Sequence, residues 1–85
     1  MFTLDTLSHT CFVDGQTIQL TPGEYRLLSI LLKSRNRNVD SSLLSIEVFG
    51  DVDIAKLDNL IRRIRRKTGI TIEKVRGIGY RLPLP

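Results

Sequence analysis

Residues 54–68 constrain the fold of this chain more than any other segment, because they sort onto two chemically opposite faces of one helix. At about 100° per residue, the apolar positions of this segment all fall in one sector: Ile54, Leu57, Leu60, Ile61 and Ile64. The opposite sector is polar and basic. Such a pattern predicts a helix that packs one side against a core and turns the other side outward. Residues 51–53 can supply the loop and cap before this helix, and Gly69 can end it.

The N-terminal 20 residues predict a small antiparallel sheet. Three β-like runs occur there: Phe2–Asp5, Thr10–Val13 and Gln16–Leu20. Asp14-Gly15 lies between the last two runs, and an Asp-Gly pair at this place is a strong signal for a two-residue hairpin turn. Glycine accepts the positive φ that such a turn requires.

A first helix is predicted to begin after this sheet. Thr21, Pro22 and Glu24 are the sequence signature of a capping box with proline at the first helical position. The polar and basic segment Ser34–Asn38 ends the helix. Its apolar residues recur at helical spacing and are predicted to face the core: Tyr25, Leu27, Leu28, Leu31 and Leu32.

A second helix follows a short extended link at Asn38–Asp40. Asp40 can cap it, and it is predicted to run from Ser41 to about Val48, with Phe49-Gly50 at its end. We expect it to bury Leu43, Leu44 and either Ile46 or Val48.

The chain ends in a predicted β-hairpin. Ile70–Val75 alternates as a strand, Arg76–Gly79 supplies two glycines for a turn, and Tyr80–Leu82 returns as the partner strand. A chain of 85 residues has room for one small core and no second lobe, so residues 1–85 are predicted to form a single α+β domain. Three helices followed by such a hairpin make a winged helix-turn-helix.

The positive charge of the chain is concentrated at its C-terminal end. The formal net charge is +4, but residues 1–55 carry four bases against seven acids, whereas residues 56–85 carry nine bases against two acids. Within Arg62–Lys67 five of six residues are basic and none is acidic. Like charges three and four residues apart on a helix repel, and an anionic partner would relieve that cost. The outward face therefore favours nucleic acid over a merely solvated surface.

The major groove of DNA is wide enough to admit a helix such as residues 54–68. Arginine can reach guanine and asparagine can bond adenine there, so Arg62, Arg63 and Asn59 are the predicted base contacts. The remaining basic positions of the helix are the predicted phosphate contacts, which supply affinity without sequence information: Lys56, Arg65, Arg66 and Lys67. RNA is disfavoured, because no aromatic platform for unstacked bases lies beside this helix.

Other site chemistry finds little support in the sequence. His9 and Cys11 lie two residues apart near Asp5 and Asp14, but no further histidine or cysteine completes a ligand set, so Cys11 is predicted to be a small core residue. We expect no enzyme activity, no metal and no cofactor. No apolar run approaches the roughly 18 residues of a membrane span, no export signal is visible, and a single cysteine suits the cytoplasm.

Four segments of the chain closely resemble the winged-helix effector domain of OmpR/PhoB-type response regulators, in the order of that family. They are LTPGEYRLLSILL (20–32), Phe49-Gly50, LDNLIRRIRRKTG (57–69) and VRGIGYRL (75–82). The resemblance implies a bacterial transcription regulator of a two-component system that binds promoter DNA. It further implies that Arg62 and Arg63 lie in the major groove, that Arg76 on the wing reaches the minor groove, and that the positions of Lys56, Asn59 and Arg65 also face DNA.

The chain departs from that family in three ways. Only Asp51–Lys56 lies between Gly50 and Leu57, fewer residues than the usual loop, which in many members contacts RNA polymerase. Asn59 and Leu60 replace the common valine and histidine, so the preferred DNA sequence is expected to differ. The chain contains no receiver domain, and the isolated domain is expected to be a monomer that can bind in tandem on DNA. The shortened loop keeps a second hypothesis open, in which the basic face docks an acidic protein without DNA.

Overall fold

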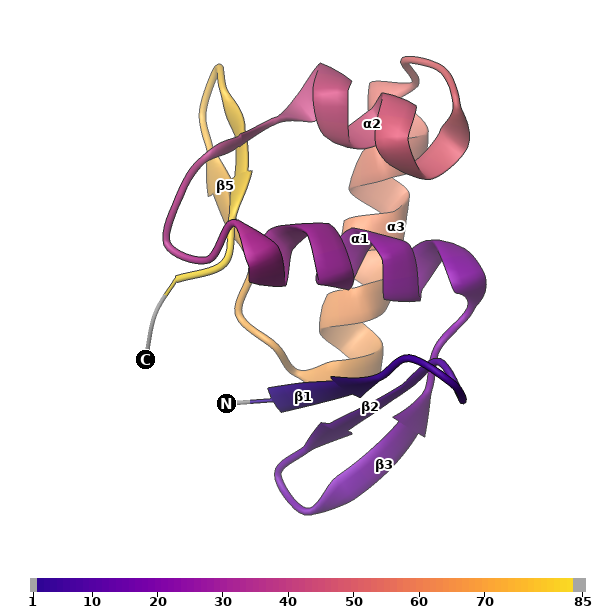
Figure 1. The fold of residues 1–85 in the computed structure, drawn as a ribbon. Coiled ribbons are helices and arrows are strands. Elements are labelled where there is room, and N and C mark those ends of the chain that lie inside the picture. The colour runs from indigo at the N-terminus through magenta and orange to yellow at the C-terminus, as the bar shows by residue number, and fades with distance from the viewer. Residues whose placement is uncertain (1, 84–85) are drawn as a thin grey trace.

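The computed structural model describes residues 2–83, which form three helices with one small sheet below them and a second small sheet beside them (Figure 1). The elements follow in the order β1 (Phe2–Asp5), β2 (Thr10–Val13), β3 (Gln16–Gln19), α1 (Pro22–Lys33), β4 (Val39–Asp40), α2 (Ser41–Phe49), α3 (Ile54–Thr68), β5 (Glu73–Val75) and β6 (Gly79–Arg81). The predicted α+β winged arrangement is therefore confirmed in element type and order.

The N-terminal sheet is antiparallel in the order β1-β2-β3. Asp14 and Gly15, with φ of 49° and 78°, form the two-residue turn between β2 and β3. Two consecutive positive φ angles match the twist of the flanking strands, which is why this turn favours an Asp-Gly pair. The third strand ends at Gln19, one residue earlier than predicted. Leu20 still donates its N–H to the His9 carbonyl at 3.0 Å, and its side chain is buried in the core.

The capping box at the start of α1 is present as predicted. The Thr21 hydroxyl accepts from the Glu24 backbone N–H at 3.2 Å, and the Thr21 N–H donates to Glu24 Oε1 at 2.8 Å. These two bonds satisfy donors that a helix start would otherwise leave unpaired. Leu27, Leu28 and Leu31 then place α1 at the centre of the core.

The predicted inner face of α2 is wrong in part. Leu44 is fully buried, and Val48 is partly buried and packs against the core, so Val48 is the correct one of the two alternatives. Leu43, however, is 53% exposed, and Ile46 is 46% exposed. Ser45 is buried in their place, and its hydroxyl donates to the Asp51 carbonyl at 2.8 Å and accepts from the Asp53 N–H at 2.8 Å. Apolar residues surround much of α2, so side-chain type alone did not identify the side that packs on α1 and α3.

The apolar stripe of α3 is buried from Leu57 to Ile64, but Ile54 is 40% exposed. Ile54 is the first residue of the helix and precedes the turns that pack on the core. Asp53 caps the helix by accepting from the Lys56 N–H at 3.0 Å, and Gly69 ends it with φ of 72°, both as predicted.

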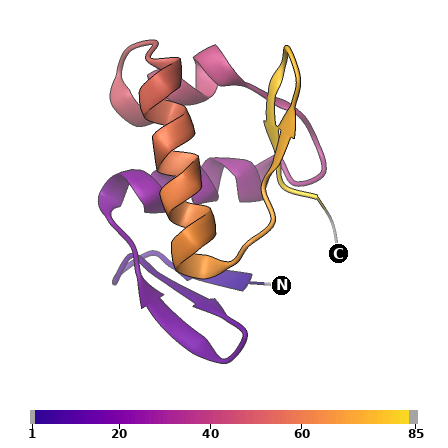
Figure 2. The same cartoon turned by 180° about the vertical axis from the view of Figure 1, so that it is seen from behind.

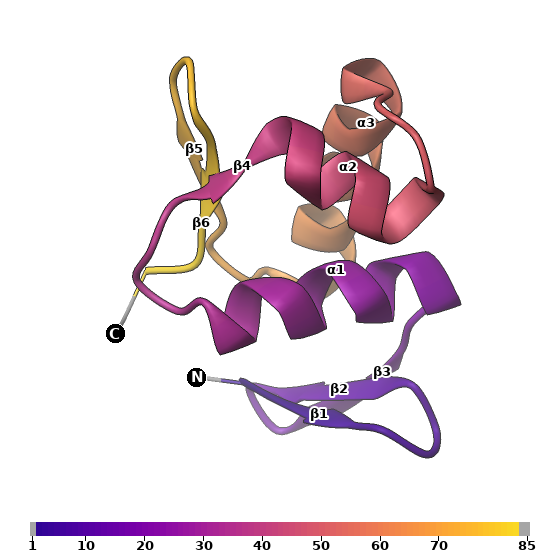
Figure 3. The same cartoon turned by 45° about the horizontal axis from the view of Figure 1, so that its top comes forward.

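The C-terminal hairpin is shorter than predicted and belongs to a larger sheet. β5 begins at Glu73, and the predicted residues Ile70 and Ile72 are buried outside the strand. β6 pairs with β5 on one side and with β4 on the other, giving the order β4-β6-β5 (Figure 3). The segment predicted as an extended link is therefore a strand that attaches the hairpin to the helical core.

Candidate nucleic-acid interface

The helix α3 runs along one face of the molecule, with the β5–β6 hairpin beside it (Figure 2). A shallow, open depression lies along the outward side of this helix. It is lined by five of the eight sequence-predicted contact residues, all of them exposed: Lys56, Asn59, Arg62, Arg63 and Arg66. We call these five residues the basic face.

The basic face keeps its charges available to a partner. Three ion pairs join described residues within 2–83, and none involves a cation of the basic face. Arg62 Nη1 donates to Asn59 Oδ1 at 3.3 Å, and the Lys56 ammonium lies 4.7 Å from the centre of the Phe49 ring. Four unneutralised cations on one helix side attract an anionic surface, and the cost of their mutual repulsion falls when phosphate approaches.

Arg76 lies apart from the basic face, in the exposed turn between β5 and β6. Gly77, with φ of 75°, follows it, and the Ile78 N–H donates to the Val75 carbonyl at 3.0 Å to close the turn. The turn therefore presents Arg76 at the hairpin tip, at a second position from which DNA could be contacted.

Arg65 is not part of the basic face. Its Nε donates to the Ile72 carbonyl at 3.1 Å, and Nη2 donates to the same oxygen. The guanidinium thus holds the segment between α3 and β5 through the Ile72 carbonyl, which lies just before β5. Arg65, a predicted phosphate contact, is exposed but already donates to a partner within the protein.

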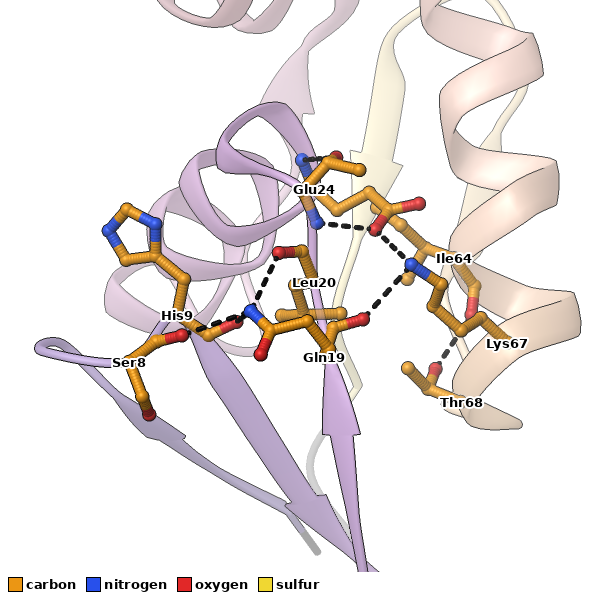
Figure 4. Close-up of polar contacts among 9 residues, drawn as sticks. Ser8, His9, Gln19, Leu20, Glu24, Ile64, Lys67 and Thr68 are labelled. Atoms are coloured by element: carbon orange, nitrogen blue, oxygen red, sulfur yellow. Dashed lines mark hydrogen bonds and ion pairs between the residues drawn. The ribbon is translucent and has the colours of Figure 1, made fainter.

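Lys67 is also engaged within the protein (Figure 4). Its Nζ lies 2.7 Å from Glu24 Oε1 and donates to the Gln19 carbonyl at 3.0 Å. Glu24 is only 3% exposed. Burial alone would raise the pKa of Glu24, but the hydrogen bonds from Lys67 and Thr21 outweigh it and hold that pKa below its ordinary value. Lys67 therefore ties the end of α3 to the start of α1 and to the N-terminal sheet.

A contact between α3 and the hairpin was not predicted from the sequence. The Tyr80 hydroxyl on β6 donates to Asp58 Oδ1 on α3, and Lys74 Nζ on β5 lies 3.6 Å from Asp58 Oδ2. Burial and the neighbouring Asp58 carboxylate raise the pKa of Tyr80 to about 12, so the hydroxyl remains a donor at ordinary pH. Asp58 is the one acid in residues 54–68, and a lone acid in a basic helix is the signal that could have indicated a specific partner.

The residues set aside in the sequence have structural roles. Cys11 is fully buried in the core, as predicted. His9 lies outside β2 and stacks on Tyr25, with ring centres 4.6 Å apart. Within residues 2–83 no group of acids, histidines and cysteines is arranged to hold a metal ion. The helices formed by these residues are also too short or too polar to span a bilayer.

An N-terminal sheet, three helices and a hairpin beside a basic third helix define a winged helix-turn-helix protein. The chain belongs to the family of transcriptional regulatory proteins, C-terminal, whose model matches residues 15–82. The resemblance to OmpR/PhoB-type effector domains is thereby confirmed.

Individual proteins give the same assignment. The response regulator protein PmrA of Pseudomonas aeruginosa is 34% identical over 86 residues, which cover 96% of this chain and 39% of PmrA. The DNA-binding domain of CpxR from E. coli is 30% identical with a TM-score of 0.85, over 96% of this chain and 89% of that domain. The Klebsiella pneumoniae RstA DNA-binding domain, solved in complex with the RstA box, has a TM-score of 0.84 over 96% of this chain and 90% of its own. At 21% identity it shows the shared fold alone. The chain thus spans about two fifths of the length of PmrA.

Proposed function

We propose that this chain is a single DNA-binding domain that recognises a specific double-stranded sequence and regulates transcription. The observation that carries the proposal is the basic face, whose exposed cations have no acidic partner within residues 2–83. The family and the CpxR domain, which is described as DNA-binding, support it. Because the proposed partner is promoter DNA, we also propose that the protein acts in the cytoplasm.

The structure suggests a division of roles among the predicted contacts. Arg62, Arg63 and Asn59 would contact base edges in the major groove, since they lie near the middle of the basic face. Lys56 and Arg66, at its two ends, would contact phosphates. Arg76 at the hairpin tip would reach the minor groove or the adjacent backbone. Arg65 and Lys67 are proposed to hold α3 in place rather than to contact DNA.

Contact with RNA polymerase is a separate matter from DNA binding. Only residues 50–53 connect α2 to α3. We therefore propose that the chain binds DNA but does not activate transcription through the loop between α2 and α3.

Two copies of the domain would bind DNA in tandem if the selected binding sites contain paired direct repeats.

Substitution of Arg62 or Arg63 by alanine is expected to weaken binding to the preferred duplex by about 2 kcal/mol and to relax the preference at the contacted base. The preferred sequence would first be selected from a random duplex library, and affinity would then be measured by titration across a range of salt concentrations. Steep loss of affinity with salt is expected, because bound phosphates release counterions.

Arg37→Ala is the matched control for these substitutions. It removes the same charge from an exposed residue that lies between α1 and β4, outside the basic face. Its effect on affinity is expected to be small and independent of DNA sequence. Equal binding of the unmodified chain to selected and scrambled duplexes would contradict sequence recognition. No binding to any duplex, with retained binding to an acidic protein, would favour the protein-docking hypothesis instead.

A further inference from the structure

Binding through both α3 and Arg76 requires a defined spacing between the helix and the hairpin tip. The hairpin meets α3 through Tyr80, which is 2% exposed and whose hydroxyl donates to Asp58 Oδ1. Lys74, on the other strand of the hairpin, lies 3.6 Å from the second oxygen of the same carboxylate. One side chain of α3 therefore contacts both strands of the hairpin.

The opposite flank of the hairpin is held by the backbone. Gly79 lies opposite Asp40 in the β4–β6 pair, and the Ser41 N–H donates to the Ile78 carbonyl at 3.0 Å. Arg65 holds Ile72 just before β5. The base of the hairpin is thus fixed between β4 and α3, and the Asp58–Tyr80 hydrogen bond is the more buried of its two side-chain links to the helix, the other being the Lys74–Asp58 ion pair.

The position of Asp58 along α3 connects this link to the basic face. Asp58 immediately precedes Asn59 and lies four residues, about one helical turn, before Arg62. Its side chain is about one third exposed, yet one carboxylate oxygen accepts from Tyr80 and the other faces the Lys74 ammonium. An acid beside a DNA-binding surface repels phosphate, so its presence there is better explained by an internal role than by contact with DNA.

We propose that the Asp58–Tyr80 pair positions the hairpin for DNA binding, so that Arg76 and the basic face engage one duplex together. Asp58 and Tyr80 are positioning residues, since the pair acts through Arg76. This inference rests on the proposed DNA binding. Loss of the pair would leave each contact surface intact but would allow the hairpin tip to move relative to α3, and the contribution of Arg76 to affinity would fall.

A double-mutant cycle with Tyr80→Phe and Arg76→Ala tests this positioning role. Tyr80→Phe removes one hydroxyl and leaves the charge unchanged. In the otherwise unmodified chain, Arg76→Ala is expected to weaken binding to the selected duplex about tenfold, the loss of one good DNA contact. In the Tyr80→Phe background, the same substitution is expected to cost about threefold or less, because the misplaced tip contributes little.

Tyr25→Phe is the matched control. The Tyr25 hydroxyl donates to Thr6 Oγ1 at 3.1 Å, far from α3 in the sequence and outside the hairpin. The effect of Arg76→Ala is expected to be unchanged in that background. Asp58→Asn, which keeps an oxygen to accept from Tyr80, is expected to retain most of the coupling, and Asp58→Ala is expected to lose it.

Hydrogen exchange of the free protein gives a readout that does not depend on DNA. Backbone amides of residues 73–81 are expected to exchange faster in Tyr80→Phe than in Tyr25→Phe, with the helices equally protected in both. If Arg76→Ala costs the same in the unmodified and Tyr80→Phe backgrounds, the positioning role is overturned while DNA binding stands. If the unmodified chain binds no duplex, the proposed function itself fails.

Discussion

Gly79→Ala is expected to remove the C-terminal sheet or to prevent folding altogether. A Cβ added at Gly79 would lie 1.8 Å from the Val39 carbonyl oxygen and 2.8 Å from the Ser41 nitrogen. Both are backbone atoms of β4 and the start of α2, so neither can rotate away. The clash requires β6 to separate from β4, and we expect a loss of about 4 kcal/mol or more, a large share of the stability of a small domain.

Gly23→Ala is the control for this substitution. A Cβ at Gly23 would meet only the side chains of Val48 and Leu60, at 3.9 and 4.0 Å, which are ordinary contact distances. Because Gly23 lies in the first turn of α1, alanine there is expected to be neutral or to stabilise by several tenths of a kcal/mol. Urea unfolding followed by circular dichroism measures both variants. Cooperative unfolding of Gly79→Ala near the midpoint of the unmodified chain would show that β4 and β6 are not packed as described.

The role of Gly79 illustrates which parts of this fold the sequence could predict. Local signals were sufficient where a single turn or cap decides the structure: the Asp14-Gly15 turn, the Thr21–Glu24 capping box and the Gly69 helix end. Gly79 was predicted only as a turn residue. Its close approach to β4 depends on a strand 40 residues earlier in the chain, and nothing local to VRGIGYRL indicates that partner.

The candidate site, too, could be predicted from the sequence only in part. Helical periodicity placed Asn59, Arg62, Arg63 and Arg66 on one outward face, and Lys56 joins them at the start of α3. Periodicity placed Arg65 at the flank of this face, about 20° from Ile54, but it could not identify the Ile72 carbonyl as the partner of Arg65. That partner depends on where the chain goes after the helix ends. Positive charge suggested a DNA contact for every basic residue of α3. Which bases already have an internal partner is decided by tertiary packing.

Lys67→Met is expected to destabilise the fold by about 3 kcal/mol. It removes the ammonium that pairs with Glu24, which is 3% exposed, and leaves that carboxylate buried with only the Thr21 groups beside it. Removal of one partner from a buried ion pair typically costs about 3–5 kcal/mol. The lower value applies because Lys67 is itself 36% exposed, so solvent screens the pair. Lys33→Met, at an exposed lysine in the last turn of α1, is expected to change stability by less than about 0.5 kcal/mol.

The pH dependence of this loss of stability tests whether Glu24 is its cause. Its pKa is lowered in the folded chain, so the ion pair contributes fully above the ordinary glutamate value of 4.5, and the contribution disappears as pH falls through the lower folded value. The stability gap between the unmodified chain and Lys67→Met should therefore be constant near neutral pH and narrow below about pH 5. A gap that is unchanged down to pH 3 would assign the loss to packing of the lysine stem.

DNA affinity measured on the same variant separates the two roles considered for Lys67. Arg66→Ala and Lys67→Met each remove one positive charge from adjacent positions at the end of α3, so long-range attraction of DNA falls equally in both. Arg66 belongs to the basic face and has no acidic partner within residues 2–83, whereas Lys67 is committed to Glu24 and Gln19. Under conditions where both variants are folded, Arg66→Ala should lose more affinity and reduce the salt dependence more. An equal loss would restore Lys67 to the phosphate contacts and would mean that its ammonium leaves Glu24 when DNA binds.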